Sequence, residues 1–576
     1  MGDNENRKVY QAREVKNYRE LVDYSCTQYA QNIAYKYKKD HTAKEVEYIE
    51  KTYEQFGKDI KAFSTGLLNL DLMGKRVVVI GNNRYEWCVS YFAITCGNMV
   101  VVPIDKALPD NEIETLIRRS EAEAIIFDKK YLEVAKKSQQ DNSTNLKLLI
   151  CMDDIQEKEV KTFKNIVEEG TKQILAGDKK YDHIEIDENK MSIMLFTSGT
   201  TNEPKAVMLS QANICANIND IACWVKLYPN DVLLSFLPIH HTFESTITFL
   251  YGFYSGSQVA FCDGLKYIQK NLSEYKVTVF VAVPLILETM YKKIQKGIEE
   301  KGKTKLINTM TKISNTLLKA KIDIRKIVFK QVLDNFGGHL RVVLYGAAPM
   351  NKDTIIGFNN LGISLVQGYG LTETSPVVTA ETDKEKRPGS VGIALASLNL
   401  RIDNPDKDGV GEIAVKGPSV MLGYYKNEEE TKKVLKDGWF STGDYGYIDE
   451  DGFVYVTGRK KDIIVLKNGK NVYPQEIEFL INKIPYVAES LVYSRDKDTT
   501  DTMLCAKIVY DKDAIKLALG EKTEAEYQDC IWQEVKNINQ ELPIFKRIKH
   551  ISITTEPFKK TTTQKVKRYE ELKNVE

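Results

Sequence analysis

The sequence lacks the residue patterns of several common protein classes. Its nine cysteines are never spaced as CxxC and only six histidines accompany them, so a structural zinc site is not expected. The sequence has 81 Lys and Arg against 80 Asp and Glu. The net charge is therefore close to zero and gives no reason to expect a nucleic-acid partner. The pattern GxxxxGK[ST] is absent, which argues against a motor protein or a GTPase.

The sequence also has little that favours a membrane span or an exported protein. Residues 1–17 are polar and contain no apolar signal core. The uncharged stretch 245–262 is interrupted by Gly252 and by a Ser-Gly-Ser-Gln run, and it is short for the ~20 residues that a bilayer needs. We expect a buried helix that runs into a strand there, in a cytoplasmic protein with reduced, mostly buried thiols.

What the sequence does contain is the composition of a large globular protein. Its 576 residues, 43% hydrophobic and 28% charged, predict several domains with a large core. Amphipathic stretches such as 110–122 alternate with short runs that are apolar on both faces, as buried parallel strands are. These runs are 75–83, 99–105, 123–128, 146–154, 277–284 and 340–348. We predict doubly wound α/β subdomains, in which ligands bind beyond the carboxyl ends of strands.

The pattern changes after residue 385. Gly and Pro become frequent and the apolar runs become short and alternating, which predicts a β-rich subdomain. After residue 462 an α+β pattern runs to the end of the sequence. We therefore predict an α/β fold with a large N-terminal domain over residues 1–458 and a small, mobile α+β domain over 459–576.

One segment is strongly basic. Residues 291–330 carry twelve Lys or Arg against three acidic residues, and their apolar residues fall at helical spacing. One interpretation is a pair of surface helices with a solvated basic face, which is the commoner role of such runs. The other is a contact for an anionic membrane surface or a polyanionic ligand. Both interpretations stay open.

The strongest chemical signal is the segment 195–207, LFTSGTTNEPKAV. A β-like run leads into a loop whose candidate phosphate-binding residues are Thr197, Ser198, Gly199, Thr200, Thr201 and Lys205. Backbone N–H groups around a glycine can converge on phosphate oxygens, hydroxyls add donors, and a lysine adds a point charge. Ordinary Ser/Thr/Gly loops look much the same, so this loop alone does not fix a function.

A second segment, 367–376 (QGYGLTETSP), suits a nucleotide with a metal ion. Tyr369 lies between two glycines, where its ring could stack on a purine. Thr372 is a small hydroxyl donor, and Glu373 is a hard oxygen ligand of the kind that Mg²⁺ takes. Taken alone, Glu373 would more often be a solvated loop carboxylate.

Five blocks in one order resemble the adenylate-forming enzymes: acyl- and aryl-CoA synthetases, peptide-synthetase adenylation domains and luciferases. The blocks are 195–207, 237–244 (LPIHHTFE), 344–350 (LYGAAPM) followed by 367–376, 437–446 (DGWFSTGDYG) and 458–478 (GRKKDIIVLKNGKNVYPQEIE). The resemblance covers almost the whole chain and looks strongest for the long-chain fatty acyl-CoA synthetases. It implies that a fatty acid and ATP, with Mg²⁺, form acyl-AMP and pyrophosphate. Coenzyme A would then take the acyl group and release AMP.

The resemblance also implies roles for particular residues. Glu373 and Thr197 would hold magnesium, and Lys205 would contact the triphosphate. Asp444 and Arg459 would contact the ribose, and His241 would flank the substrate carboxylate. The remaining candidate nucleotide contacts are Gly346, Ala347, Ala348, Gln367, Gly368, Tyr369, Gly370 and Thr372.

The C-terminal domain is expected to supply the catalytic lysine. Residues 557–572 (PFKKTTTQKVKRYEEL) resemble the closing motif of the family, in which a lysine follows a Thr-rich stretch. The register points to Lys565, with Lys567 as the alternative, and the cation would bridge the attacking carboxylate and the α-phosphate. Lys461 would be the hinge of the small domain, and Gly469 would let pantetheine pass close to the backbone.

Three alternatives to a fatty acid–CoA ligase stay open. The first is an adenylating enzyme that loads an acyl carrier protein instead of CoA. The second is a non-catalytic acyl-binding relative on the same fold. The third is a ligase for aryl or short-chain acids, since the chain-length preference cannot be read from the sequence. The oligomeric state cannot be read from the sequence either.

Overall fold

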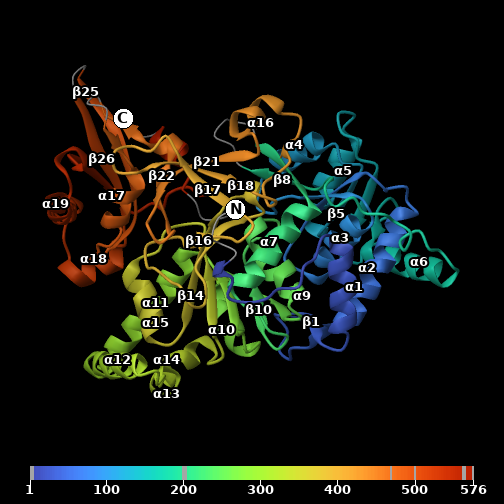
Figure 1. The fold of residues 1–576 in the computed structure, drawn as a ribbon, viewed down its shortest axis with the longest axis horizontal. Helices are drawn as coiled ribbons and strands as arrows, with labels where there is room; N and C mark the ends of the chain where they lie inside the picture. The colour runs from blue at the N-terminus through green and yellow to red at the C-terminus, as the bar shows by residue number, and fades with distance from the viewer. Residues whose placement is uncertain (1–5, 198–203, 467–469, 499–500, 561–565, 574–576) are drawn as a thin grey trace. The chain divides into compact units, whose positions relative to one another are not determined.

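The computed structural model describes residues 6–197, 204–466, 470–498, 501–560 and 566–573 (Figure 1). The chain forms two compact units. The first unit comprises residues 1–399 and 415–440, and the second comprises residues 400–414 and 441–576. The second unit thus includes stretches that precede residue 459, and the domain boundary at 458/459 stays a prediction.

The first unit contains a nine-stranded sheet with the order β16-β15-β14-β13-β12-β10-β11-β1-β2. Its strands are β1 Ile33–Lys38, β2 Tyr48–Thr52, β10 Val232–Ser235, β11 Gln258–Phe261, β12 Val279–Ala282, β13 Val342–Tyr345, β14 Ser364–Gly370, β15 Val377–Ala380 and β16 Ile393–Ala394. The six strands from β14 to β1 in this order run parallel. The runs predicted at 277–284 and 340–348 are confirmed as β12 and β13, both fully buried.

A second sheet of eight strands, also in the first unit, has the order β19-β9-β8-β4-β3-β5-β6-β7. Its strands are β3 Arg76–Ile80, β4 Val100–Pro103, β5 Ala124–Phe127, β6 Leu148–Cys151, β7 Lys161–Thr162, β8 Met191–Thr197, β9 Lys205–Ser210 and β19 Gly423–Tyr424. The four N-terminal runs predicted as strands are confirmed as β3 to β6. They pair in parallel, and their Val, Ile and Leu side chains form one buried cluster with α4 (Asp110–Ser120) and α5 (Leu132–Gln140).

Helix α7 (Gln211–Trp224) packs against strands of both sheets. Its Asn217 amide is buried, donates to the carbonyl oxygen of Val377 at 2.7 Å and accepts from the N–H of Val377 at 3.1 Å. Both ends of the amide are thus satisfied by the backbone of β15, the strand next to the edge strand β16. This contact fixes the register of α7 against β15.

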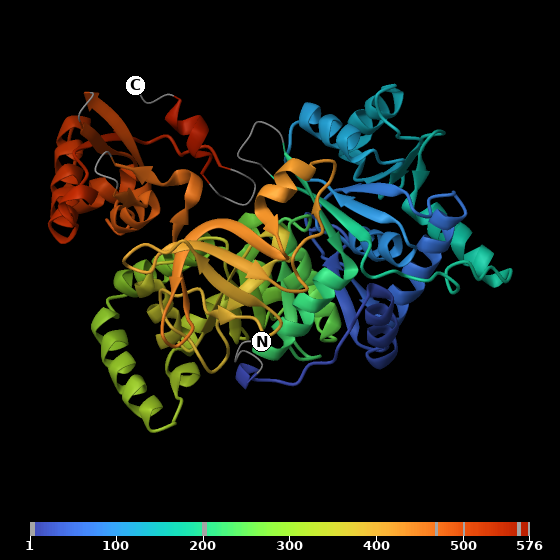
Figure 2. The same cartoon turned by 45° about the horizontal axis from the view of Figure 1, so that its top comes forward.

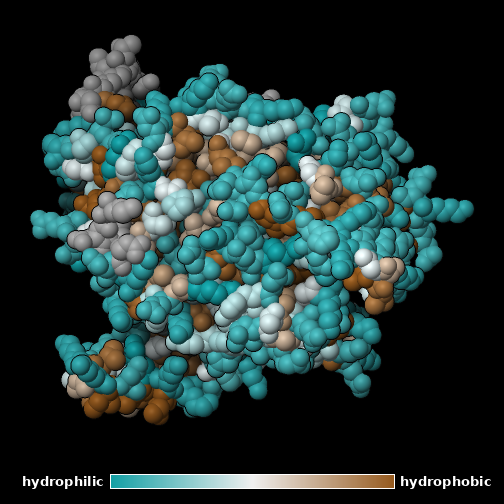
Figure 3. All heavy atoms as spheres, turned by 45° about the vertical axis from the view of Figure 1, so that its right-hand side comes forward, coloured by the Kyte–Doolittle hydropathy of each residue, from teal (hydrophilic) through white to brown (hydrophobic). Residues whose placement is uncertain are grey.

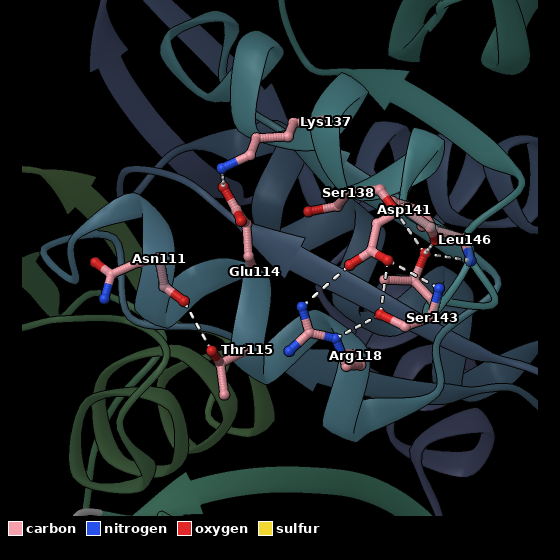
Figure 4. A network of polar contacts seen from close by, with 10 residues as sticks. Asn111, Glu114, Thr115, Arg118, Lys137, Ser138, Asp141, Ser143 and Leu146 are labelled. Atoms are coloured by element: carbon pink, nitrogen blue, oxygen red, sulfur yellow. Dashed lines mark hydrogen bonds and ion pairs between the residues drawn. The ribbon is translucent and has the colours of Figure 1, made fainter.

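The amphipathic stretch predicted at 110–122 is confirmed as α4 (Asp110–Ser120). Two acidic residues lie in its first turn and two arginines in its last, which complements the helix dipole. Figure 4 shows how its exposed face is tied to α5 (Leu132–Gln140) and the following loop. Lys137 bonds Glu114 at 2.7 Å, and Arg118 bonds Ser143 at 2.7 Å and Asp141 at 3.0 Å.

The remaining helices of the first unit cover the two sheets. They include α1 Tyr18–Gln28, α2 Tyr53–Leu68, α3 Tyr85–Cys96, α6 Phe163–Leu175, α8 Thr242–Glu244, α9 Gly252–Tyr254, α10 Ile268–Glu274, α11 Pro284–Glu300, α12 Thr304–Lys319, α13 Arg325–Val328, α14 Lys330–Leu333, α15 Lys352–Asn360 and α16 Glu428–Val434. Helices α11 to α14 project from the unit as a lobe (Figures 1 and 2).

The uncharged stretch 245–262 is a buried helix that runs into a strand, as predicted. It forms a π-helix over Ser245–Tyr251, then α9 and then β11, and the helical part is buried throughout. Over the described residues, the chain has no helix that combines the length and the apolarity needed to cross a bilayer.

The β-rich part predicted after residue 385 is confirmed. Strands β17 Asn399–Asp403, β18 Gly411–Lys416, β20 Leu435–Lys436, β21 Trp439–Ile448 and β22 Val454–Arg459 form one sheet. The second unit ends in an α+β layer built from β25 Val487–Asp498, β26 Asp501–Tyr510 and β27 His550–Thr554, with α17 Pro474–Ile481, α18 Lys512–Leu519, α19 Glu524–Glu541 and α20 Arg568–Leu572. The predicted α/β fold class, with its β-rich part and small α+β part, is therefore confirmed.

Candidate active site

Three of the predicted site segments converge at the carboxyl ends of parallel strands in the nine-stranded sheet. A Cβ atom placed on Gly346, after β13, would lie 2.7 Å from the carbonyl oxygen of Gly368 in β14. It would also lie 3.7 Å from the ring of Phe243, which follows His241. Because only glycine fits this approach, the turns 344–350, 367–370 and 241–244 form one surface, at the edge of a parallel sheet where ligands commonly bind.

The turn after β13 is held in an uncommon backbone conformation. Ala347 has a φ of 72°, in the left-handed region that side chains with a Cβ adopt rarely and that is found more often at functional sites. Gly346 is buried, whereas Ala347 and Ala348 are exposed. Two small exposed residues on a sharp turn leave the flat space that a nucleotide base would need.

The segment predicted to bind the nucleotide, 367–376, begins in strand β14. The Tyr345 hydroxyl donates to Gln367 Oε1 at 2.8 Å, and the Gln367 N–H donates to Glu381 Oε2 at 3.0 Å. Burial raises the pKa of Glu381. Gly368, Tyr369 and Gly370 complete the strand, and the turn Thr372–Thr374 follows, so the backbone of QGYGLTET is fixed on both sides.

The predicted triphosphate lysine and the predicted magnesium glutamate belong to one cluster. Lys205 Nζ contacts Glu430 Oε2 at 2.6 Å and lies 5.0 Å from the centre of the Tyr424 ring. The Tyr424 hydroxyl donates to Glu373 Oε1 at 3.0 Å. Tyr424 lies on β19, which pairs with β9 beside Lys205. Pairing of β19 with β9 therefore places one tyrosine next to Lys205 by its ring and next to Glu373 by its hydroxyl.

The ion pair gives Lys205 a partner before any nucleotide arrives. Hydrogen bonds from Lys205 and Lys433 lower the pKa of Glu430 to about 2, so Glu430 is ionised at neutral pH. A triphosphate that binds Lys205 would therefore have to displace Glu430 from the lysine. Thr197 ends β8, where its hydroxyl donates to the carbonyl of Lys205 at 3.4 Å. Ser198, Gly199, Thr200 and Thr201 lie outside the described residues.

The predicted ribose contacts lie in the second unit, opposite each other on β21 and β22. Asp444 is buried, and its Oδ1 pairs with Arg459 Nε at 2.7 Å. Within β21, the Asp444 N–H donates to Thr442 Oγ1 at 3.1 Å. Lys461, the predicted hinge, is exposed in the short turn Lys460–Asp462. Its role as a hinge stays a prediction, and Gly469 lies outside the described residues.

The predicted catalytic lysine, Lys565, lies outside the described residues, but the residues that follow it are described. Lys567 is half exposed and pairs with Glu570 at 3.0 Å. Arg568 bonds Glu478 at 2.7 and 3.0 Å and donates to the carbonyl of Val492 at 2.7 Å. Arg568 therefore anchors the closing segment to α17 and β25.

The sequence interpretation missed a buried polar network beneath His241. Glu244 is fully buried and accepts from Ser235 Oγ at 2.6 Å and from Thr248 Oγ1 at 2.9 Å. Asn83 donates to Ser235 Oγ at 2.8 Å and to the carbonyl of Leu237 at 2.7 Å, and accepts from the N–H of Ile239 at 3.3 Å. Burial raises the pKa of Glu244 to about 8. The network holds the 235–241 loop to the Asn83 turn.

The signal for this network was weak in the sequence. Glu244 is the one charged residue at the start of a long uncharged run, which marks it as a buried carboxyl. Glu244 is linked to Asn83 through Ser235, and along the sequence Asn83 and Ser235 are about the length of a domain apart. No local sequence pattern predicts a contact over such a separation.

Comparison with known proteins agrees with this geometry. Residues 24–425 match the AMP-binding enzyme family and residues 461–575 match the AMP-binding enzyme C-terminal domain. These two matches identify an adenylate-forming enzyme that uses ATP to activate an acid, within the AMP-forming acid–thiol ligases. The chain belongs to the AMP-binding enzyme family.

Several curated relatives are named as long-chain ligases. The chain is 30% identical over 516 residues to long-chain-fatty-acid–CoA ligase 6 of Mus musculus, covering 84% of this chain and 73% of that protein. It is 28% identical over 464 residues to a long-chain-fatty-acid–CoA ligase of Mycobacterium bovis, covering 77% and 74%. It is 27% identical over 597 residues to a chloroplastic long-chain-fatty-acid–acyl-carrier-protein ligase of Arabidopsis thaliana, covering 90% and 81%.

Solved structures share the fold. The anthranilate CoA ligase AuaEII with anthranoyl-AMP matches with a TM-score of 0.76 at 18% identity, covering 97% of this chain and 96% of that one. ATP-bound MatB of Rhodopseudomonas palustris matches with a TM-score of 0.72 at 23% identity, covering 96% and 99%. At these identities the likeness establishes the fold and leaves the substrate open.

Proposed function

We propose that this protein is a long-chain fatty acid–CoA ligase. The observation that carries the proposal is the cluster of Lys205, Tyr424 and Glu373, which brings the two residues predicted to hold Mg·ATP to one place. Support for a long-chain substrate comes from the names of curated relatives at 27–30% identity.

The first half-reaction joins the acid to the nucleotide. A carboxylate oxygen of the fatty acid attacks the α-phosphorus of ATP, the bond to the β-phosphate oxygen breaks, and pyrophosphate leaves. Lys205 would exchange Glu430 for the triphosphate, and Lys565 would neutralise charge between the carboxylate and the α-phosphate. His241, on the loop that Asn83 holds, would flank the carboxylate. Positioning and electrostatics would supply the catalysis, as in phosphoryl transfer.

The residues present fit a magnesium ion on the triphosphate. Glu373 is a partly exposed carboxylate whose Oε1 accepts from Tyr424, which orients its Oε2 as a hard oxygen donor. Thr197, at the end of β8, is the second predicted ligand. A bound magnesium ion would neutralise phosphate charge during the displacement.

The second half-reaction transfers the acyl group to CoA. The CoA thiolate attacks the acyl carbon of acyl-AMP, the bond from that carbon to the phosphate oxygen breaks, and AMP leaves. In this proposal the small domain turns about Lys461, two residues after Arg459, between the two half-reactions, and Gly469 lines the path of pantetheine. Asp444 and Arg459 would bind the ribose throughout. The basic segment 291–330 is proposed as a peripheral contact with anionic membrane.

A second candidate is an enzyme that loads an acyl carrier protein. The Arabidopsis relative named for that acceptor covers more of this chain than the two CoA ligases above. The two candidates share the first half-reaction and differ only in the thiol that takes the acyl group.

Pyrophosphate release tests both candidates. We expect release to rise with acid chain length and acyl-CoA to form when CoA is added. Acyl-AMP that forms but turns over only with a carrier protein would contradict the CoA assignment. Activity confined to aryl or short-chain acids would contradict the long-chain assignment.

A further inference from the structure

Gln367 is held at three of its polar groups by two buried residues. Its N–H donates to Glu381 Oε2 at 3.0 Å, and its carbonyl oxygen accepts from the Glu381 N–H at 2.8 Å. Its side-chain Oε1 accepts from the Tyr345 hydroxyl at 2.8 Å. The exposed fractions of Gln367, Glu381 and Tyr345 are 7%, 4% and 1%. Glu381 therefore binds both backbone polar groups of Gln367, and Tyr345 orients its side-chain amide.

Glu381 is an unusual place for a carboxyl group. The face of the molecule seen in Figure 3 is largely hydrophilic, and ionisable side chains are rarely buried as deeply as Glu381. Burial of a carboxyl costs desolvation free energy unless hydrogen bonds offset it. Here Oε2 accepts the N–H of Gln367, and Oε1 accepts the N–H of Arg387 at 2.8 Å. Each oxygen of the buried carboxyl thus serves one backbone N–H group.

The loop that begins with Glu381 binds strand β14 at a second place. Lys386 Nζ donates to Ser364 Oγ at 2.5 Å and to the carbonyl oxygen of Leu365 at 2.7 Å. Because β14 begins at Ser364, residues 381–387 contact the strand at its first two residues and again at Gln367. We call residues 381–387 the β14 clamp. The clamp restrains the position of β14 along its own direction.

Gln367 lies next to the turns of the candidate active site. Gly368 follows it, and the Gly368 carbonyl oxygen lies 2.7 Å from the position that a Cβ atom on Gly346 would take. Tyr369, predicted to stack on the purine, comes next on β14. Because the two turns approach each other this closely, a displacement of Gln367 would change the spacing between them and the place of the Tyr369 ring.

We propose that Glu381 and Tyr345 are positioning residues for the nucleotide base. Neither touches the nucleotide: Glu381 holds the backbone of Gln367, and Tyr345 holds its side-chain amide, so that residues 367–369 present one fixed surface to the adenine. Contacts held in one geometry distinguish adenine from guanine better than contacts that can shift. The inference rests on the nucleotide site of the proposed function, but not on the acid or on the thiol that takes the acyl group.

Equilibrium binding of ATP, GTP and inorganic tripolyphosphate to the full chain, each with Mg²⁺, tests the proposal. Glu381→Gln keeps the size of the side chain but replaces one acceptor by a donor, so one of the two N–H groups loses its partner. We expect ATP to bind roughly 5–20-fold more weakly, because a buried donor is left unsatisfied. The affinity for GTP should fall less, and tripolyphosphate should bind as it does to the parent, because it has no base.

Two further variants separate the backbone of Gln367 from its side chain. Tyr345→Phe should weaken ATP binding roughly threefold, as expected for one lost hydrogen bond. In a Gln367→Ala background Tyr345→Phe should have no further effect, because the amide that it orients is gone. Glu381→Gln should weaken ATP binding in both backgrounds, because Glu381 acts on the backbone of residue 367.

Asp231→Asn is the matched control. Asp231 is also a buried carboxylate that accepts a backbone N–H, from Tyr228 at 2.8 Å, and it pairs with Arg341 Nε at 2.8 Å. It directly precedes β10, so it lies at the opposite end of the parallel strands from the turns of the site. We expect Asp231→Asn to lower the melting temperature and to bind ATP like the parent. Melting curves show that every variant is folded at the temperature of the binding measurements.

Three results would overturn the proposal. They are an unchanged affinity of Glu381→Gln for ATP, an equal loss of affinity for ATP and tripolyphosphate, and the same loss of ATP affinity in Asp231→Asn. Each would mean that Glu381 supports the fold without positioning the base. Because neither a fatty acid nor CoA is present, a failure of the proposed long-chain ligase activity would leave these binding results unaffected.

Discussion

At the scale of single residues, the site is organised by a tyrosine that no motif highlights. Tyr424 orients Glu373 through its hydroxyl and lies beneath the ammonium group of Lys205. Lys205 is at the same time held by Glu430, an ionised carboxylate of α16. ATP binding should therefore replace one ion pair of Lys205 by another, so that the lysine is already oriented when the triphosphate arrives.

Removal of the Lys205 ammonium should weaken ATP binding more than removal of a neighbouring charge. We expect Lys205→Ala to raise the KM for ATP roughly 10–100-fold, because a charge-assisted hydrogen bond contributes about 1.5–3 kcal/mol. Lys433→Ala is the control, since Lys433 pairs with the same carboxylate at 2.7 Å but is exposed on α16. Steady-state kinetics in ATP measure both. Equal effects would show that Lys205 acts only as a partner of Glu430.

Loss of the Tyr424 hydroxyl should raise the magnesium requirement. Tyr424→Phe keeps the ring next to Lys205 but removes the hydrogen bond to Glu373. We expect the Mg²⁺ concentration for half-maximal rate to rise roughly 3–10-fold, because one hydrogen bond contributes about 0.5–1.5 kcal/mol. Tyr425→Phe is a matched control, because its hydroxyl bonds Glu121 at 2.9 Å instead. A magnesium titration that is the same for Tyr424→Phe and the parent would contradict the role assigned to Tyr424.

At the scale of elements, the loop that carries His241 depends on a buried carboxyl. Glu244 ends α8 and precedes the π-helix, and its bond to Ser235 links the end of β10 to the Asn83 turn after β3. The loop is thus supported from both sheets of the first unit. A shift of this loop would move His241 relative to Gly346, because Phe243 packs beside that glycine.

Glu244 should make stability depend on pH. Its pKa is about 8 in the folded protein against an ordinary value of 4.5, so between these values the folded state binds more protons than the unfolded state. Stability therefore falls as pH rises through this window; the penalty is absent below it and complete above it. Glu244→Gln stays neutral, so its melting temperature relative to that of the parent should rise as pH rises. The expected gain is about 1 °C for each kcal/mol of penalty removed, because the unfolding entropy of so large a unit is high.

Melting curves of the parent and the variant between pH 4.5 and pH 8.5 measure this difference. Glu133→Gln, at an exposed carboxyl of α5, is the control and should follow the parent at every pH. A constant offset between Glu244→Gln and the parent would mean that Glu244 is ionised in the folded protein.

Elements were predictable where their pattern is local. The strands β3 to β6 and β12 to β13 and the helix α4 follow from period and composition over fewer than fifteen residues. The contacts that build the site are not local: Lys205 and Glu430 are 225 residues apart, and Tyr424 and Glu373 are 51 apart. The resemblance pointed to Lys205 and Glu373 but gave no indication of Tyr424, Glu430, Asn83 or Glu244, because their roles exist only once β19 pairs with β9 and the two sheets meet.

At the scale of the whole molecule, the chain has two compact units with different parts of the predicted site. The residues predicted to hold the triphosphate, the base and the acid belong to the first unit, and those predicted to hold the ribose belong to the second. Arg568 fixes the segment after Lys565 to the second unit by bonds to Glu478 and Val492. The predicted catalytic residue Lys565 thus belongs to the second unit, whereas the residues predicted to hold the triphosphate belong to the first.

The exchange of labelled pyrophosphate into ATP tests this account most directly, because it reports the reversal of adenylate formation and needs no CoA. The account predicts exchange that depends on a long-chain fatty acid and on Mg²⁺, and that is lost in Lys565→Ala while that variant still converts supplied acyl-AMP and CoA to acyl-CoA. Fatty-acid-dependent release of ADP and phosphate, or exchange that survives in Lys565→Ala, would contradict it.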